Sequence, residues 1–350
     1  MNYCTLFDSH YLDKGLTMIT SLMQVAPQSY IYVLCMDELC HTILKSMSIN
    51  NVYLINLNDF EDEELIETKK TRTHGEYCWT CTSKLIKYCI LKFALNNCTY
   101  LDSDLYFFSN PEILLNKLGT DHCQVQTVSH NFSKTPYGKY LENVYGFNCV
   151  QFNSFTNSKL SLELLDKWID ECLNGCNIMT GGDQEYTNSW IAYPFVSVSK
   201  NLGAGMAPWN FYRYRFAQDG FAFDRFEKKI YELVFFHFQN LLFLDEKKVR
   251  IMTKTEHWKC DKKLFDYVYS IYLRKIVGFR KLLEDKYNLR PHTTLYISRE
   301  KKTKIREYFK NIKGNKIVGL FYKISLSICF MLRKKQMEYP ISYFLNGGDQ

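Results

Sequence analysis

An α/β fold with a mostly parallel sheet, covered by helices on both faces, is predicted by two features of the first hundred residues. Short runs of strand-forming residues alternate with amphipathic helical patterns. These runs are apolar throughout, as expected for strands that are buried on both faces. The 350 residues include 46% hydrophobic and 23% charged residues, which indicates a packed globular chain and excludes extensive disorder.

The elements are predicted in chain order from these patterns. Strands are expected at Asn2–Phe7, Tyr30–Met36 and Val52–Asn56. A helix between the first two has Asp13 as its N-cap and an apolar face of Leu16, Ile19, Leu22 and Met23. Thr82 caps a second helix, with an apolar stripe of Leu85, Ile86, Cys89, Ile90 and Phe93. A buried strand at Cys98–Leu101 follows and ends in Asp102-Ser103-Asp104.

The C-terminal third differs from the rest of the chain in charge. From Lys247 to Lys335 there are 25 Lys and Arg against 7 Asp and Glu, a net charge of +18 in a chain whose total is +7. Such asymmetry favours an anionic partner surface, either a membrane or a nucleic acid. The pattern also becomes helical from about Glu256, apart from a possible strand at Thr294–Ile297. We expect an α/β domain over residues 1–250 and a basic, mainly helical region over residues 251–350.

The segment from Asn315 to Lys335 carries apolar residues on one helical face, fringed by lysines. Its uninterrupted apolar run is too short to span a bilayer. Two interpretations remain open: a helix in the plane of an anionic membrane, or an amphipathic helix docked on the α/β domain. The basic cluster from Arg299 to Lys313 favours the membrane.

The thirteen cysteines are odd in number and follow no disulfide spacing. The opening residues lack the basic start of a secretory signal, so reduced thiols in a cytoplasmic protein are expected. Cys78-Trp79-Thr80-Cys81 has the spacing of a redox or half-zinc site, but no second such pair exists, and core packing is the preferred interpretation.

Asp102 and Asp104 are the strongest candidates for a functional site. They follow a buried strand, and ligands of open α/β sheets collect beyond the carboxyl ends of the strands. Two carboxylates separated by one residue on an extended segment point the same way and can share one cation. Mg²⁺ or Mn²⁺ prefers such oxygen ligands together with substrate phosphates. The alternative is a loop with solvated aspartates.

The stretch from Trp79 to Ile113 resembles nucleotide-sugar transferases of the GT-A fold, particularly glycosyltransferase family eight and related bacterial polysaccharide enzymes. In that family a strand ends in an Asp-x-Asp that binds the metal. Four further blocks occur in the family's order: Phe7-Asp8-Ser9-His10-Tyr11, Gly146-Phe147-Asn148-Cys149-Val150, Gly181-Gly182-Asp183-Gln184 and Val234-Phe235-Phe236-His237. The resemblance covers residues 2–240.

The resemblance implies a role for each matching residue. The nucleotide would contact Phe7, Asp8, Tyr11 and Asp102, with Asp8 accepting a hydrogen bond from the base and Tyr11 stacking on it. The donor sugar would contact Lys84, Ser103 and Asn148. The cation, Mn²⁺ or Mg²⁺, would be held by Asp102, Asp104 and His237. Asp183 and Gln184 would lie beside the sugar and carry the catalytic role; Gly181-Gly182-Asp183 also reads as a helix start.

The expected activity is metal-dependent transfer of a sugar from a UDP-sugar to a glycan or lipid-linked glycan, with retention of configuration, in bacterial surface polysaccharide synthesis. The protein would then work at the cytoplasmic face of the membrane. One departure concerns the diphosphate. The family's late histidine is followed by Gly and then Lys-Pro-Trp, whereas Phe238-Gln239-Asn240 follows His237 and Ala207-Pro208-Trp209-Asn210 precedes it.

Three other functions are alternatives to sugar transfer. A nucleotidyltransferase of similar fold is expected to carry a Gly-rich basic loop after the first strand, which Phe7–Tyr11 does not provide. A nucleic-acid-binding protein would need basic residues interleaved with aromatics on a known module, and no such module is present, so no nucleic-acid partner is expected. A transferase that has lost its activity is disfavoured by the intact Asp102, Asp104, Asp183 and Gln184.

Overall fold

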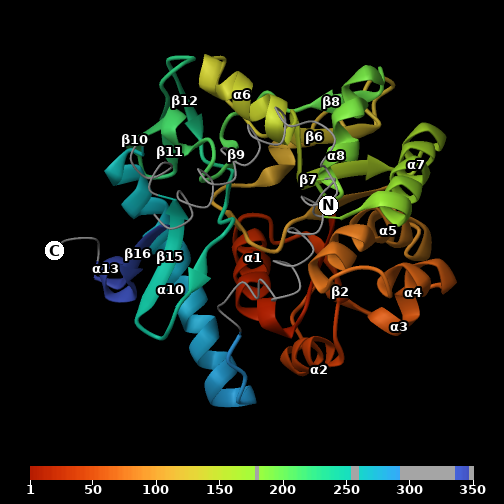
Figure 1. Ribbon diagram of the computed structural model, residues 1–350, viewed down its shortest axis with the longest axis horizontal. Coiled ribbons are helices and arrows are strands. Elements are labelled where there is room, and N and C mark those ends of the chain that lie inside the picture. The colour runs from red at the N-terminus through yellow and green to blue at the C-terminus, as the bar shows by residue number, and fades with distance from the viewer. Residues whose placement is uncertain (178–180, 254–259, 292–335, 347–350) are drawn as a thin grey trace, which may run out of the picture.

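A seven-stranded sheet forms the centre of the computed structural model, which describes residues 1–177, 181–253, 260–291 and 336–346 (Figure 1). The strand order is β3-β2-β1-β4-β7-β6-β8. The strands are β1 (Asn2–Phe7), β2 (Tyr30–Cys35), β3 (Val52–Asn56), β4 (Asn97–Leu101), β6 (Val125–Ser129), β7 (Asn148–Thr156) and β8 (Val196–Val198). Only β7 runs antiparallel to its neighbours β4 and β6. The predicted α/β class with a mostly parallel sheet is confirmed.

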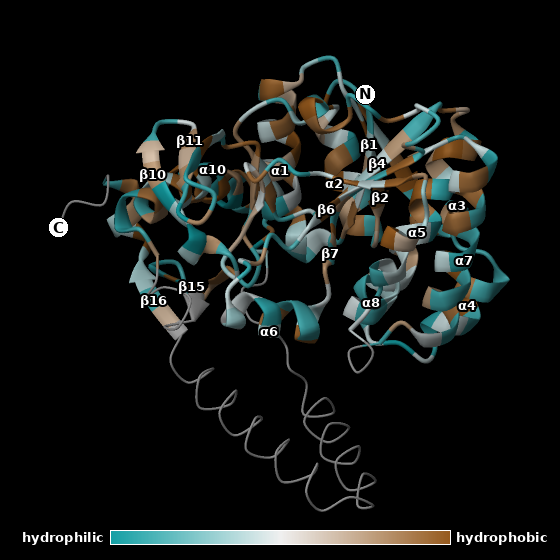
Figure 2. Cartoon of the chain, turned by 90° about the horizontal axis from the view of Figure 1, so that it is seen from above, coloured by the Kyte–Doolittle hydropathy of each residue, from teal (hydrophilic) through white to brown (hydrophobic). Residues whose placement is uncertain are grey.

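Helices cover both faces of this sheet, and the alternation of side chains along β1 shows how. Tyr3 and Phe7 belong to the core cluster that contains residues of α1 and α2, whereas Cys4 and Leu6 belong to the cluster on the α5 and α7 side. Apolar colouring gathers on the strands and on the helix sides that face them (Figure 2). The helices of this part are α1 (Leu12–Val25), α2 (Glu38–Met47), α3 (Leu57–Phe60), α4 (Glu63–Lys69), α5 (His74–Lys92), α6 (Pro136–Tyr145), α7 (Lys159–Gly175) and α8 (Gln184–Thr187).

A third core cluster joins Tyr106 to residues between Leu202 and Phe344. It lies around the sheet β5-β13-β9 and the helix α10, which packs beside α1 (Figure 1). Its strands and helices are β5 (Leu105–Phe107), β9 (Ala204–Met206), β10 (Tyr214–Gln218), β11 (Phe221–Asp224), β12 (Lys229–Glu232), β13 (Phe235–His237), β14 (Leu242–Phe243), β15 (Lys248–Thr253), α10 (Lys262–Tyr287), β16 (Gln336–Pro340) and α13 (Ile341–Leu345). Short 3-10 helices occur at Ser9–Tyr11, Pro111–Leu114, Asn188–Ala192 and Phe211–Arg213.

The boundary expected at residue 250 falls inside β15, which pairs with β14 on one side and β16 on the other. The described part of residues 251–350 therefore contains strand as well as helix. The strand expected at Thr294–Ile297 and the helix expected at Asn315–Lys335 lie outside the described residues. Among the helices that the structure describes, none combines the length and apolarity needed to cross a membrane.

Two predicted helix starts are wrong. Asp13 is not an N-cap: it lies inside α1, where its buried carboxylate accepts a hydrogen bond from Arg280 Nη1 at 2.6 Å. Thr82 lies within α5, which begins two turns earlier with a capping box between Thr73 and Glu76. The capping box satisfies backbone N–H groups at the true start, so the helix extends through residues whose own apolar pattern is weak.

Candidate active site

Asp102, Asp104 and His237 converge at the carboxyl end of β4. The two aspartates lie in the turn between β4 and β5, and β13 pairs antiparallel with β5 so that His237 is opposite Leu105. His237 Nε2 is 2.9 Å from Asp104 Oδ1 and 3.8 Å from Asp102 Oδ2. One ligand atom from each residue lies within 4.8 Å of the others. Two carboxylate oxygens and an imidazole nitrogen can ligate a divalent cation, so these three residues fit the metal role that the resemblance implies.

Gln151 of β7 orients the imidazole. Its Oε1 lies 2.9 Å from His237 Nδ1, which places the Nδ1–H toward Gln151 and leaves Nε2 facing the carboxylates. The ring of Trp209 packs edge-on against the other side, with centroids 5.2 Å apart. The histidine is therefore held in one orientation by a polar and an aromatic neighbour.

The carboxylates of this cluster differ in proton affinity. Burial raises the pKa of Asp102 to about 6, and the charge of Asp104 adds to the effect while His237 opposes it. Burial also acts on Asp104, but the charge and hydrogen bond of His237 outweigh it and lower its pKa to about 2. Burial lowers the pKa of His237, and the two aspartates more than compensate, so the net shift is upward.

Asp183 and Gln184 start the short helix α8, near this cluster. Burial raises the pKa of Asp183 to about 7, and the negative charge of Asp102 contributes, which shows that the two carboxylates share one electrostatic environment. Asp183 occupies the N-cap position of α8, where the helix-start interpretation placed it, but its side chain makes no capping hydrogen bond. Gln184 Nε2 donates to Tyr145 O at 3.2 Å.

Asp8 and Tyr11 lie at the end of β1, in the adjacent part of the sheet. Asp8 Oδ1 accepts from the backbone N–H of Tyr11 at 3.1 Å, and Oδ2 lies 2.7 Å from His74 Nε2. The hydrogen bond with Asp8 raises the pKa of His74 to about 10, so His74 is cationic at neutral pH. Tyr11 remains 39% exposed and can offer a ring face, whereas Phe7 is buried.

The three residues assigned to the donor sugar come from α5, from the turn between β4 and β5, and from β7. Lys84 is in the middle of α5 and forms an ion pair with Asp62 at the start of α4, not in the first turn of the helix as expected. Asn148 is fully buried at the start of β7; its Nδ2 donates to Thr187 O at 2.6 Å, and its Oδ1 has no hydrogen-bond partner in the described part of the chain. Ser103 is half-buried between the two aspartates. The sugar contacts of all three stay predictions.

Several polar residues of this region escaped the sequence analysis, namely Lys14, His74, His130, Gln151 and Trp209. His130 follows β6, stacks on Phe132, and has a pKa lowered to about 4, chiefly by burial. Its carbonyl accepts from Trp209 Nε1 at 3.1 Å. Only Trp209 stood in a noted motif, because isolated polar residues carry no local signal of where the chain places them.

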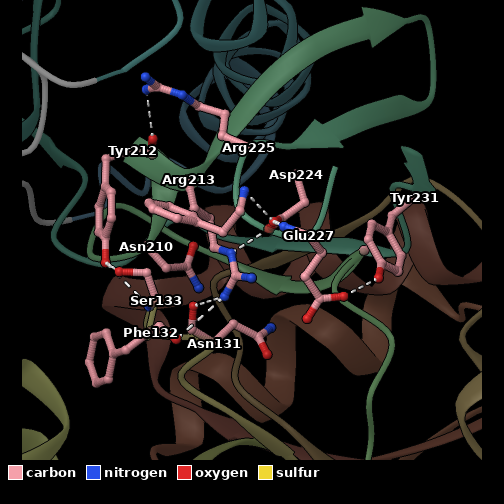
Figure 3. Close-up of polar contacts among 12 residues, drawn as sticks. Asn131, Phe132, Ser133, Asn210, Tyr212, Arg213, Asp224, Arg225, Glu227 and Tyr231 are labelled. Atoms are coloured by element: carbon pink, nitrogen blue, oxygen red, sulfur yellow. Dashed lines mark hydrogen bonds and ion pairs between the residues drawn. The ribbon is translucent and has the colours of Figure 1, made fainter. Parts of the chain in front are cut away.

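A buried ion pair fixes the loop that carries His130. Arg213 Nε donates to Asp224 Oδ2 at 2.5 Å and Arg213 Nη1 donates to Asn131 O at 2.5 Å, both drawn in Figure 3. Ser133 of the same loop is hydrogen-bonded to the hydroxyl of Tyr212. The hairpin of β10 and β11 thereby anchors the segment that carries His130.

A second group of acceptable metal ligands is formed by Cys4, Cys89 and Cys98, whose sulfurs lie within 4.8 Å of one another. All three are completely buried in the apolar cluster between the sheet and α5. Each of the twelve cysteines in the described residues is free. Cys81 is buried in α5, as core packing requires.

Comparison with known proteins gives relatives in sequence and in fold. No family model matches the chain. Two uncharacterized proteins of Bacillus subtilis are similar in sequence. YfnD is 27% identical, and the match covers 71% of this chain and 81% of YfnD. YfnF is 26% identical, and the match covers 82% of this chain and 96% of YfnF. Solved structures that resemble the chain include three glycosyltransferases. Galactosyltransferase LgtC, in complex with donor and acceptor sugar analogues, is 13% identical, with 69% of this chain and 87% of LgtC covered and a TM-score of 0.47. Mouse xyloside xylosyltransferase 1 is 12% identical, with 69% of this chain and 98% of that chain covered and a TM-score of 0.43. The bifunctional glycosyltransferase WbbM is 16% identical, with 59% of this chain and 39% of that chain covered and a TM-score of 0.40.

Proposed function

We propose that this protein is a metal-dependent glycosyltransferase that uses a nucleoside-diphosphate sugar as donor. One observation carries the proposal: two carboxylates and an oriented imidazole, from the β4–β5 turn and from β13, meet within 4.8 Å at the carboxyl end of the sheet. Such a cluster is costly in a protein interior unless it binds a cation. The resemblance of five sequence blocks to family eight supports the choice of sugar transfer over other metal-dependent reactions.

In this reaction the bond between the anomeric carbon and the diphosphate oxygen breaks, and a bond from that carbon to an acceptor hydroxyl forms, with release of the hydroxyl proton. When bound to Asp102, Asp104 and His237, Mn²⁺ or Mg²⁺ supplies Lewis-acid stabilisation of the departing diphosphate. Positive charge develops on the sugar at the same time. Asp183 and Gln184 would face that charge, Asp183 as an anion above its pKa of about 7.

UDP is the proposed nucleotide, because Tyr11 offers an exposed ring beside the Asp8 carboxylate. The Asp8–His74 pair already satisfies one carboxylate oxygen, so base recognition would involve both side chains rather than Asp8 alone. Retention of configuration fits a site in which Gln184 is an amide rather than a base. The proposed acceptor is a glycan or a lipid-linked glycan, and the proposed pathway is the synthesis of a bacterial surface polysaccharide. The protein would attach to an anionic membrane through Asn315–Lys335.

A thermal-shift panel of nucleotide sugars, with and without Mn²⁺, tests this function. We expect one UDP-sugar to raise the melting temperature only when Mn²⁺ is present. Asp104→Asn should abolish the shift, and Asp121→Asn, which changes an exposed aspartate elsewhere, should leave it intact. A melting temperature that no nucleotide sugar changes would contradict the proposal. If the protein releases pyrophosphate from UTP in the presence of a sugar phosphate, its activity is nucleotidyl transfer instead.

The membrane part of the proposal has its own test. Full-length protein should sediment with liposomes that contain phosphatidylserine and not with phosphatidylcholine liposomes, and the binding should weaken as salt rises. Equal binding to both, or binding to neither, would refute it without affecting the proposal about catalysis.

A further inference from the structure

The proposed donor brings more negative charge than a divalent cation can balance. Asp102 and Asp104 together neutralise one such ion, and the diphosphate of a nucleotide sugar adds two further charges. Most buried or half-buried cations around the site already have a carboxylate partner: Arg213 pairs with Asp224, Arg280 with Asp13 and Lys84 with Asp62. After His237 no Lys or Arg occurs before Lys247. A donor diphosphate therefore needs another positive group.

Lys14 is a buried cation of a different kind. It lies in the first turn of α1, only 7% exposed, and takes part in no ion pair among the residues that the structure describes. Its Nζ lies 4.1 Å from the ring centroid of Tyr11, the residue proposed to hold the base. Burial lowers the pKa of Lys14, but Tyr11 and the charges of Asp104 and Asp13 raise it above its ordinary value, so the ammonium stays charged.

The packing of α1 fixes this position. Gly15 lets the helix lie directly on β1, because a Cβ there would come within 2.5 Å of the Phe7 ring. Further along, Ser21 Oγ accepts from the backbone N–H of Phe107 at 3.1 Å and ties α1 to β5, the strand that starts beside Asp104. Lys14 is thus held between the end of β1 and the metal cluster, with little freedom to move elsewhere.

A second buried donor lies on α10, the helix that packs beside α1. The hydroxyl of Tyr272 on α10 is buried and has no hydrogen-bond partner within the described ranges. Its ring stacks on Phe238 at 3.7 Å, directly after His237 in the chain. Burial raises the pKa of Tyr272, and the charges of Asp104 and Asp13 add to this, so the hydroxyl stays a donor. A buried ammonium without an ion-pair partner and a buried hydroxyl without an acceptor, both in the electrostatic field of Asp104, indicate a polyanionic ligand.

We propose that Lys14 is a diphosphate-binding residue, which contacts the phosphates of the donor between Tyr11 and the cluster of Asp102, Asp104 and His237. The inference rests on the proposed function and gives it a second positive group beside the cation. The ammonium would act as a point charge on the phosphates. Tyr272 would add a neutral hydrogen bond from the other side.

Calorimetric titration of the full chain with UDP and UMP, both with Mn²⁺, isolates this contact. The ratio of the affinity for UDP to the affinity for UMP measures how much the second phosphate contributes to binding. Lys14→Met should reduce that ratio about ten- to hundredfold, as expected for the loss of one charge-assisted hydrogen bond, and should change UMP binding much less. Lys14→Arg should keep most of the ratio. Lys92→Met, which removes an exposed lysine from the end of α5, is the matched control.

Circular dichroism establishes that each variant is folded, and Lys14→Gln replaces Lys14→Met if the latter is not. Inorganic pyrophosphate with Mn²⁺ serves as a probe that is independent of the base, and its binding should fall in parallel. A UDP-to-UMP ratio that is the same in wild type and in folded Lys14→Met would overturn this inference and leave the proposed function standing. Wild-type protein that binds neither UDP nor pyrophosphate would overturn both.

Discussion

Binding of Mn²⁺ should weaken steeply as pH falls below 7, because the cation has to displace protons. The pKa of Asp102 is about 6, so about 90% of this carboxyl is ionised at pH 7 and about 10% at pH 5. This group alone should raise the apparent Kd about tenfold between the two pH values. His237, whose pKa is also raised, must lose its proton too and makes the dependence steeper. Asp104, with a pKa of about 2, is ionised throughout.

The signal of free Mn²⁺ in electron paramagnetic resonance gives this Kd directly at each pH. In His237→Gln the positive charge that holds down the pKa of Asp102 is gone, so the pH at which binding is half-maximal should move upward as affinity drops. Asp121→Asn should follow the wild-type curve. An apparent Kd that stays constant from pH 7 to pH 5, or a His237→Gln variant that binds as tightly as wild type, would refute the assignment of these ligands.

Three further changes test the packing of α1 and α10. Arg280→Ala leaves the buried carboxylate of Asp13 without its ion-pair partner and should lower the free energy of unfolding, measured by urea titration, by about 3–5 kcal/mol. A decrease no larger than that for an exposed ion pair would show that the Arg280–Asp13 pair stabilises the contact between α1 and α10 only weakly. Gly15→Ala forces a Cβ against Phe7 and should cost about 1–3 kcal/mol by the same measurement, with an unchanged stability contradicting the close approach. Gly278→Ala in α10 should instead stabilise the chain by about 1 kcal/mol, because alanine favours the helix more than glycine does and no atom lies within 4 Å of the added Cβ. Destabilisation by this change would show that the space around Gly278 is not open.

The parallel part of the sheet was predictable because its signals are local. Runs such as Asn2–Phe7 and Cys98–Leu101 are rich in apolar and strand-forming residues, and the observed β1 and β4 differ from them by at most one residue. The position of Asp102 and Asp104 after β4 follows from the same pattern. Helix starts were less predictable: Thr73 and Glu76 cap α5 through a reciprocal contact, whereas the apolar periodicity of this helix becomes clear only after Thr82.

Contacts between distant segments left no such signal. The partner of Asp13 is Arg280, in the last part of the described chain, and no pattern around Asp13 indicates it. The pairing of β13 with β5 brings His237 to the aspartates, and this was accessible only through the resemblance to family eight. Lys14 and Gln151 belong to no motif and are recognised as part of the site only in three dimensions.

The order in which the chain is made has a consequence for this arrangement. Strands β1 to β4 are contiguous in sequence and can associate while later residues are still being synthesised. Asp102 and Asp104 are therefore synthesised well before β13, which pairs with β5 only later. A nascent chain that ends before Phe235 would carry both aspartates without the imidazole beside them. Tight manganese binding should therefore appear late in synthesis, as a mark of a finished fold.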